Sequence, residues 1–301
     1  LQILEESWGG PAVKTQDKIG AWLEENMGSV DWQREGLRNF ADIKNIQFSV
    51  SGGKPGSRYY ISASATDDKG LMWQNENKKI NFRTKLDLDL SKIVKFGVNV
   101  SFAYQNTSRP VNNFIDFYRT PSFLPVRHND WSTALTGYSG YARGSHFNSL
   151  SAPVGDPDEY GNPTWSSKAS PFSSSNNNPK HIMETTERSN EAFNALANAY
   201  LEINICKGLK FRTSDGANVR FAPGYTYSMY GAKKDGDPSA ATYSSVLRMN
   251  LLSENTLNYD LKAGKHAFNA LLGYTVEFTR LQKVHMSATG FPTDDIHTLN
   301  A

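Results

Sequence analysis

The stretch 80–104, INFRTKLDLDLSKIVKFGVNVSFAY, decides the fold of this chain. From position 80 to 90 every second residue is apolar except Thr84, and the residues between them are polar or charged. After a turn, the alternation resumes over 96–104. Side chains of a strand point alternately to its two faces, so each strand has one apolar and one polar face. Long strands with ionised side chains on the polar face are typical of a transmembrane β-barrel.

The same alternation predicts eight antiparallel strands along the chain. The predicted tight turns lie at 52–56, 91–95, 207–208 and 262–265, and the predicted long loops lie at 67–77, 106–188, 222–244 and after 281. In outer-membrane barrels, short turns face the periplasm and long loops face outward. We therefore expect barrel strands within 43–281, interrupted by a large extracellular loop at 106–188. The flanking regions, 1–42 with a possible short helix at 14–27 and 282–301, are expected to belong to extracellular loops.

The composition is compatible with a barrel and argues against other classes. Hydrophobic residues make up 38% of the chain and the mean hydropathy is -0.55, an average that a barrel permits because only alternate residues face lipid. No run approaches the ~20 apolar residues of a membrane helix. A net charge of +2 argues against a nucleic-acid partner. The single cysteine, Cys206, excludes an intrachain disulfide and a multi-cysteine metal cluster.

Two other folds also produce this alternation. A soluble β-sandwich with one solvated face has the same period and would suit a carbohydrate-binding protein. A closed eight-stranded outer-membrane barrel with a structural or adhesive role has the same strand count. Several predicted strands exceed the ~5–6 residues usual in globular proteins, and short turns alternate strictly with long loops, which favours a membrane barrel over a sandwich.

A series of short motifs follows this strand plan. The motifs are Asp31–Trp32–Gln33, FSVSGG at 48–53, YYIS at 59–62, DKG at 68–70, KFGVNV at 95–100, KHAF at 265–268, LGY at 272–274, GFP at 290–292 with Asp294–Asp295, and Leu299–Asn300. In this order and spacing they resemble the SusC/RagA-type TonB-dependent outer-membrane transporters, over most of residues 31–301.

The resemblance implies a plugged barrel of about 22 strands, of which the chain would hold strands two to nine. It implies TonB-dependent import of oligosaccharides or peptides across the outer membrane of a Gram-negative bacterium. The implied partners are a SusD-like surface lipoprotein, the TonB complex and outer-membrane lipid, and no cofactor is implied. The plug domain, the energy-coupling segment and the last strands would lie elsewhere. Since two open sheet edges cannot sit unpaired in lipid, we expect the chain to be a piece of a longer protein.

Ionised residues on the polar faces of the predicted strands are expected to line the lumen of the barrel. They are Arg83, Lys85, Asp87, Asp89, Glu202, Lys210, Arg212 and Glu277. An Arg or Lys that faces lipid at mid-depth costs ~2–4 kcal/mol, whereas the same charge in a wet, plugged lumen costs little and can pair with the plug. We expect structural lining, rather than ligand contact, to be the role of these residues.

Aromatic residues of the predicted outer loops are the candidates for substrate contact, because flat rings with polar neighbours hold sugars and peptides. They are Trp73, Trp131, Tyr138, Tyr141, Trp165 and Tyr230. Local packing within the loops is the alternative role for each of them. Disordered segments are poor in aromatic residues, so the large loop is expected to be mostly folded.

The sequence contains no catalytic constellation. It has no phosphate-binding loop, no nucleophile elbow and no histidine pair at helical ligand spacing, so we expect neither enzymatic activity nor a metal centre. Carboxylates at Asp156, Asp158 and Glu159 are the one candidate for calcium. They lack the full spacing of a calcium loop, which favours a solvated turn at this place.

Overall fold

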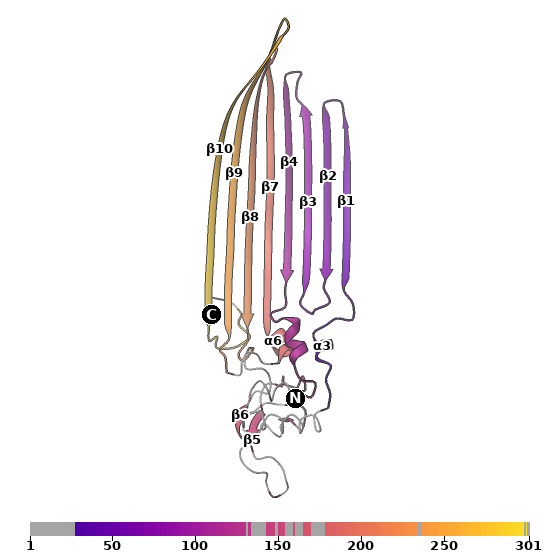
Figure 1. Ribbon diagram of the computed structural model, residues 1–301, viewed down its shortest axis with the longest axis vertical. Helices are drawn as coiled ribbons and strands as arrows, with labels where there is room; N and C mark the ends of the chain where they lie inside the picture. Colours follow the sequence, from indigo (N-terminus) through magenta and orange to yellow (C-terminus); the bar gives the residue numbers. More distant parts are fainter. Residues whose placement is uncertain are drawn as a thin grey trace.

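The computed structural model shows one long antiparallel sheet with a smaller loop region at one end (Figure 1). The structure describes residues 28–130, 132–133, 143–147, 150–153, 159, 165–169, 178–233, 236–297 and 299. The sheet has eight strands in the order β1-β2-β3-β4-β7-β8-β9-β10. Their bounds are β1 Asp42–Lys54, β2 Ser57–Lys69, β3 Glu76–Asp89, β4 Val94–Ser108, β7 Thr186–Cys206, β8 Leu209–Ser228, β9 Ala240–Ala263 and β10 His266–Thr289.

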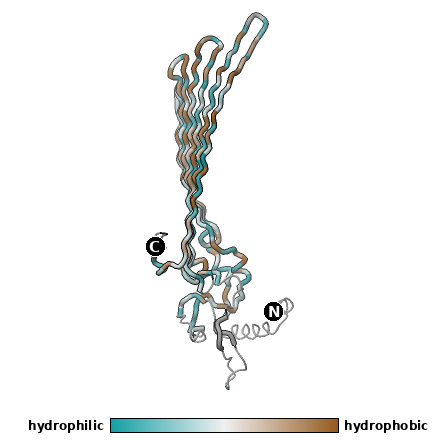
Figure 2. Tube along the Cα trace, turned by 90° about the vertical axis from the view of Figure 1, so that its left-hand side faces the viewer, coloured by the Kyte–Doolittle hydropathy of each residue, from teal (hydrophilic) through white to brown (hydrophobic). Residues whose placement is uncertain are grey.

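Each strand has one apolar and one polar face, as the sequence predicts. Hydrophobic and hydrophilic residues alternate along the strands (Figure 2). The register pairs Phe82 with Ala63 and Phe102, so the apolar face continues from strand to strand. The polar face continues in the same way, because Arg83 pairs with Ser62 and Ser101. The predicted eight-stranded segment of an antiparallel barrel is confirmed by this fold.

The later strands are longer than the alternation indicates. The expected loop at 222–244 shrinks to 229–239, because β8 stays hydrogen-bonded to β9 as far as Ser228. The last strand likewise continues past the expected boundary at 281 to Thr289. Asp215 and Pro223 break the apolar alternation of β8, but the hydrogen-bonded pairing of β8 with β9 continues past both residues. The alternation of the sequence therefore ends earlier than the strand.

All four tight turns lie at one end of the sheet, where the sequence predicts them (Figure 1). One of the two-residue turns is Lys207–Gly208 between β7 and β8. Gly208 has a φ of 86°, and a Cβ at this position would lie 2.1 Å from the carbonyl oxygen of Asp260. Only glycine fits both the left-handed conformation and the close approach of β9.

The long connections gather at the opposite end and fold around a small core of their own. They contain α3 (Trp32–Glu35), α4 (Phe114–Arg119), α6 (Pro179–Thr185) and the two-stranded sheet of β5 (Leu150–Pro153) and β6 (Trp165–Ala169). The core consists of Trp32, Phe117, Leu124, Phe147 and Met183. The indole nitrogen of Trp32 donates a hydrogen bond to the carbonyl of Leu124 at 3.0 Å. The possible helix at 14–27 falls outside the described residues.

The sheet is open, since its edge strands β1 and β10 do not pair with each other. Its apolar face is uncovered, with Phe48 66% and Leu272 71% exposed. The closed eight-stranded barrel and the sandwich are therefore not borne out, because the first needs paired edges and the second needs a covered apolar face. In the part of the chain that the structure describes, no helix is long and apolar enough to cross a membrane.

Candidate functional site

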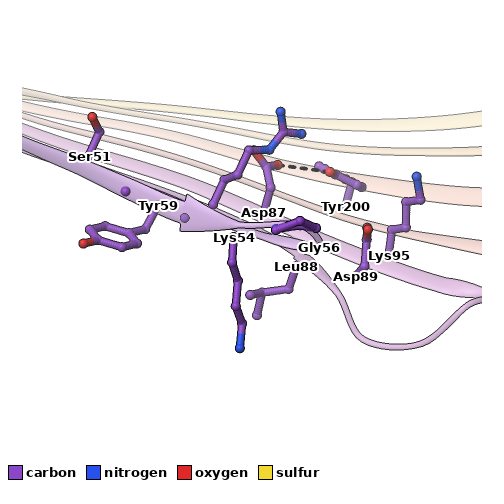
Figure 3. Close-up of a pocket in the computed structure, with 13 residues that line it drawn as sticks. Ser51, Lys54, Gly56, Tyr59, Asp87, Leu88, Asp89, Lys95 and Tyr200 are labelled. Carbon is purple, nitrogen blue, oxygen red and sulfur yellow. Dashed lines mark hydrogen bonds between the residues drawn. The ribbon is translucent and has the colours of Figure 1, made fainter.

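The charged residues predicted to line a lumen all lie on the polar face of the sheet. The register joins Lys85 on β3, through β4, β7, β8 and β9, to Glu277 on β10 in one row. Asp87 and Tyr200 point to this side of the sheet, whereas Tyr59 points to the other side (Figure 3). Six residues of this face form connected contacts and are named here the polar network: Lys85, Asp87, Tyr200, Glu202, Lys210 and Arg212.

The first half of the polar network spans β3, β4 and β7. Lys85 Nζ lies 3.4 Å from Asp87 Oδ2. The hydroxyl of Tyr200 donates a hydrogen bond to Asp87 Oδ1 at 3.0 Å, across the strand between them (Figure 3). Gly97 of β4 pairs with both residues, and a Cβ there would lie 2.1 Å from Tyr200 Cε1. A glycine is thus required for the tyrosine ring to cross β4.

The second half of the polar network extends from β7 to β8. The guanidinium carbon of Arg212 lies 4.4 Å from the ring centroid of Tyr200, a cation–π contact. Glu202 lies 3.6 Å from Arg212 Nη1 and 3.5 Å from Lys210 Nζ. The Glu202 side chain is 14% exposed, but those of Lys210 and Arg212 are 47% and 46% exposed. Both cations therefore also face the space beside the sheet and can bind a further acidic or carbonyl group.

The other three residues predicted to line the lumen lie outside this network. Arg83 Nε donates to Asn99 Oδ1 at 3.2 Å. Asp89, at the end of β3, and Glu277, on β10, are exposed. The structure thus brings together five of the eight predicted residues, adds Tyr200 to them, and leaves three at separate positions on the same face.

A hollow of about 780 Å³ lies at the turn end of the sheet, beside the polar network (Figure 3). The β1–β2 hairpin forms one wall, from Ser51 to Tyr59, and Asp87, Asp89 and Lys95 belong to its other side. The hollow is open to solvent and carries charges of both signs. Such a site suits a polar protein segment better than a small apolar ligand.

Two of the predicted substrate-contact aromatics are well described, and both stand at the loop end of the sheet. Trp73 is 42% exposed, with Arg38 4.8 Å and Lys180 5.9 Å from its ring centroid. Tyr230 is 61% exposed, and its backbone N–H donates to the carboxylate of Asp294 at 3.1 Å. The cations over Trp73 favour a packing role for that ring, whereas the ring of Tyr230 is free to touch a ligand.

The remaining candidates of the outer loops are only partly described. Trp131, Tyr138 and Tyr141 lie outside the described residues, and Trp165 is described only as the first residue of β6. Asp156 and Asp158 of the calcium candidate also lie outside, and Glu159 is exposed. Over the described residues, no group of three or more potential metal ligands comes together.

A charged cluster that no sequence pattern predicts connects α6 to the rest of the loop region. Glu184 accepts hydrogen bonds from Arg127 Nη2 at 2.7 Å and from His146 Nε2 at 2.8 Å. The His146 ring packs on His181 with centroids 4.7 Å apart, and His181 Nε2 donates to the carbonyl of Gly231 at 3.2 Å. Burial lowers the pKa of His181 to about 4, and burial also lowers the pKa of His146.

The GFP motif and the aspartates after it attach the last loop to β8. Asp294 accepts hydrogen bonds from the Tyr227 hydroxyl at 2.9 Å and from the Tyr230 N–H. The His297 ring stacks on Tyr227 at 4.1 Å, and Tyr227 is fully buried. The segment after β10 thus folds back over the loop end of β8, and Asp294 and His297 hold it there, whereas Pro292, Thr293 and Asp295 are exposed.

Comparison with known proteins agrees with this geometry. No family model matches the chain. TonB-dependent receptor P3 of Formosa agariphila is 25% identical over 278 residues, which is 90% of this chain and 25% of that receptor. TonB-dependent receptor P39 of the same organism is 23% identical over 86% of this chain and 22% of that receptor. The chain therefore spans about a quarter of the length of the curated relatives it matches.

Solved structures with the same fold belong to a transport complex. The RagAB peptide importer in its closed-closed state matches 90% of this chain and 28% of that chain, with a TM-score of 0.62 at 18% identity. Its open-open state matches 100% of this chain and 32% of that chain, also with a TM-score of 0.62. In sequence the chain is therefore similar to TonB-dependent receptors, and its fold is that of a segment of the β-strand structure in the RagAB importer.

Proposed function

We propose that this sheet is part of the wall of a plugged outer-membrane barrel that imports oligosaccharides or peptides with the help of TonB. The observation that carries the proposal is the two-sided open sheet, with an exposed apolar face, a charged polar face and two unpaired edges. In a membrane the apolar face turns to lipid and the open edges are completed by further strands. The polar face then lines the lumen.

A plug domain from another part of the same polypeptide is the partner proposed for the polar network. Its three cations, Lys85, Lys210 and Arg212, face two carboxylates, Asp87 and Glu202. The exposed ends of Lys210 and Arg212 leave donors for acidic side chains of a plug. Contacts of this kind are exposed and individually weak, at about 0–1 kcal/mol each, so a plug held by them can shift during transport.

The loop region is the proposed contact surface for substrate and for a SusD-like surface lipoprotein. The core around Trp32 and Phe117 holds these loops together, which gives a partner a defined surface to close on. Tyr230 offers an exposed ring for a sugar or peptide. The solved relatives are peptide importers, which supports peptides as one of the two proposed cargo classes.

The test is uptake by cells that carry the full-length parent protein. We expect a strain lacking the parent gene to lose uptake of at least one member of a panel of labelled oligosaccharides and peptides. A strain lacking TonB should lose the same member, because import through a plugged barrel needs an energy source. Unchanged uptake of every panel member in the parent deletion would contradict the proposal.

A further inference from the structure

The apolar face of the sheet is interrupted by polar side chains on β8 and β9. The interruption is named here the Asp215 cluster and consists of Thr213, Asp215, Ser253 and Asn255. The register pairs Asp215 with Ser253 and Thr213 with Asn255, so all four share one face. Thr213 Oγ1 donates to Asp215 Oδ2 at 3.4 Å, and Asn255 Nδ2 donates to Ser253 Oγ at 3.3 Å. The Asp215 side chain itself is exposed.

The Asp215 cluster lies within the apolar band, not at its border. Along β8 it is flanked on the same face by Phe211 and Ala217, and along β9 by Leu257 and Leu251. The residues that the register places opposite Asp215 on β7, β4, β3 and β2 are apolar. That row of the sheet runs from Asp215 through Ala199, Val98 and Leu86 to Tyr59. The β2–β4 part of this row therefore suits lipid chains, whereas its β8–β9 part does not.

Strand β10 carries a second polar interruption on the same face. Arg280 and Gln282 stand between Phe278 and Val284, and Arg280 Nη2 donates to Gln282 Oε1 at 3.3 Å. Both side chains are exposed. An ionised side chain inside a membrane is costly and is commonly paired with a partner, so an acid and a base on one outward wall indicate a protein contact.

An apolar hollow of about 400 Å³ adjoins the Asp215 cluster. Small side chains of Ala197, Ala199 and Ala217 lie along it, with the larger Leu251 and Phe278 to one side. The hollow has room for a bulky apolar side chain. The wall of β8–β10 thus combines a recess, a carboxylate and a guanidinium within one surface.

We propose that the outward face of β8–β10 binds a second, different membrane-embedded protein. Its Lys or Arg side chain meets Asp215, an acceptor meets Arg280, and an apolar side chain fills the hollow. The inference rests on the proposed function for one point, that the apolar face turns outward to lipid. Charge complementarity favours this occupant, because the acyl chains of lipid offer neither a cation for Asp215 nor an acceptor for Arg280.

A second copy of this chain is a poorer fit to the same surface. The row of Asp215 reaches β10 at Val276, four residues before Arg280. Measured from the turn end, Asp215 is six residues into β8 and Arg280 is 14 residues into β10, so the two lie at different distances from the turns and at different depths. Two copies related by an axis along the membrane normal keep each residue at its own depth. Asp215 of one copy would therefore not reach Arg280 of the other.

The test is photo-crosslinking of the full-length parent in its native outer membrane. A photoreactive amino acid replaces Ala217 beside the hollow or, as the matched control, Ile61 of β2, which lies in the same row of the sheet. We expect position 217 to give an adduct with another membrane protein, mapped to an embedded segment with a Lys or Arg. Position 61 is expected to give lipid adducts only.

Substitutions in the protein that carries the probe at position 217 test whether the charge of Asp215, and not only the shape of the surface, is needed for the contact. Asp215→Asn should lower the protein adduct about tenfold or more, since removing one member of a desolvated charge pair weakens association. Asp67→Asn, which removes a carboxylate from the same face at the end of β2, should leave the adduct unchanged.

Three results would overturn the inference: lipid adducts only at position 217, an adduct with a second copy of the parent, or a protein adduct that Asp215→Asn does not lower. The membrane fraction of the parent is measured in parallel. Its absence from the outer membrane would refute the proposed function itself, whereas the three results above leave that function standing.

Discussion

At the scale of single residues, Gly97 is the position where one atom decides a contact between strands. Its missing Cβ lets the Tyr200 ring cross β4 and reach Asp87. We expect Gly97→Ala to displace the ring, break the hydrogen bond, and lower the unfolding free energy of the parent protein by about 1–3 kcal/mol. Urea unfolding of the protein in detergent measures this loss.

Gly273→Ala is the matched control for this substitution. Gly273 lies on the same face of β10, and a Cβ there would have only the carbonyl oxygen of Asn255 within 4 Å, at 4.0 Å. The control should change stability little. Equal losses from the two substitutions would contradict the role given to Gly97 and would leave only the general cost of changing a strand glycine.

Residue positions could be predicted from the sequence better than residue contacts. Period-two alternation places Lys85, Asp87 and Glu202 on the polar face without any structure. It does not reveal that Tyr200 bridges them, because that contact depends on which strands are neighbours and on the missing Cβ between them. Asp215 was not predicted either, because the alternation assigns an apolar side chain to its position.

At the scale of elements, α6 depends on a buried neutral histidine. Burial lowers the pKa of His181 to about 4, whereas a histidine in an unfolded segment has a pKa near 6.5. A lowered folded pKa favours the folded form fully above pH 6.5, and this contribution is lost as the pH falls from 6.5 towards 4. We expect amide protection of α6 to fall over this range, as measured by hydrogen exchange on the full-length protein.

The variant His181→Gln should make that loss of protection shallower, because glutamine stays neutral and can still donate to the Gly231 carbonyl. Some pH dependence should remain, since burial also lowers the pKa of His146 and of His128. The control is His266→Gln at the exposed turn end of the sheet. A profile for His181→Gln as steep as that of the wild type would show that another group controls α6.

Strands and turns could be predicted as elements, but the loop region could not be. Each strand carries its own alternation, and three of the four tight turns contain a glycine. The loop core joins Trp32 to Leu124 and Met183, which are far apart in the sequence and have no periodic pattern. Its aromatic content predicted that it folds, and the partners of each ring depend on tertiary packing.

At the scale of the whole molecule, the two open edges are the feature that most limits what this sheet can be. Unpaired backbone groups along β1 and β10 are costly in lipid, so a membrane sheet of this kind needs further strands. The polar face likewise needs a partner that fills the lumen. Both needs are met when the sheet is one part of a larger, plugged barrel, in agreement with relatives of which it covers about a quarter.

The mass of the intact polypeptide in purified outer membranes tests this central claim most directly. An antibody against a segment of the sheet identifies the protein, and mass spectrometry measures it. The account predicts a single polypeptide several times heavier than the 33.5 kDa of this chain. A mature protein of 33.5 kDa would contradict it, because eight strands would then have to close on themselves and leave no room for a plug.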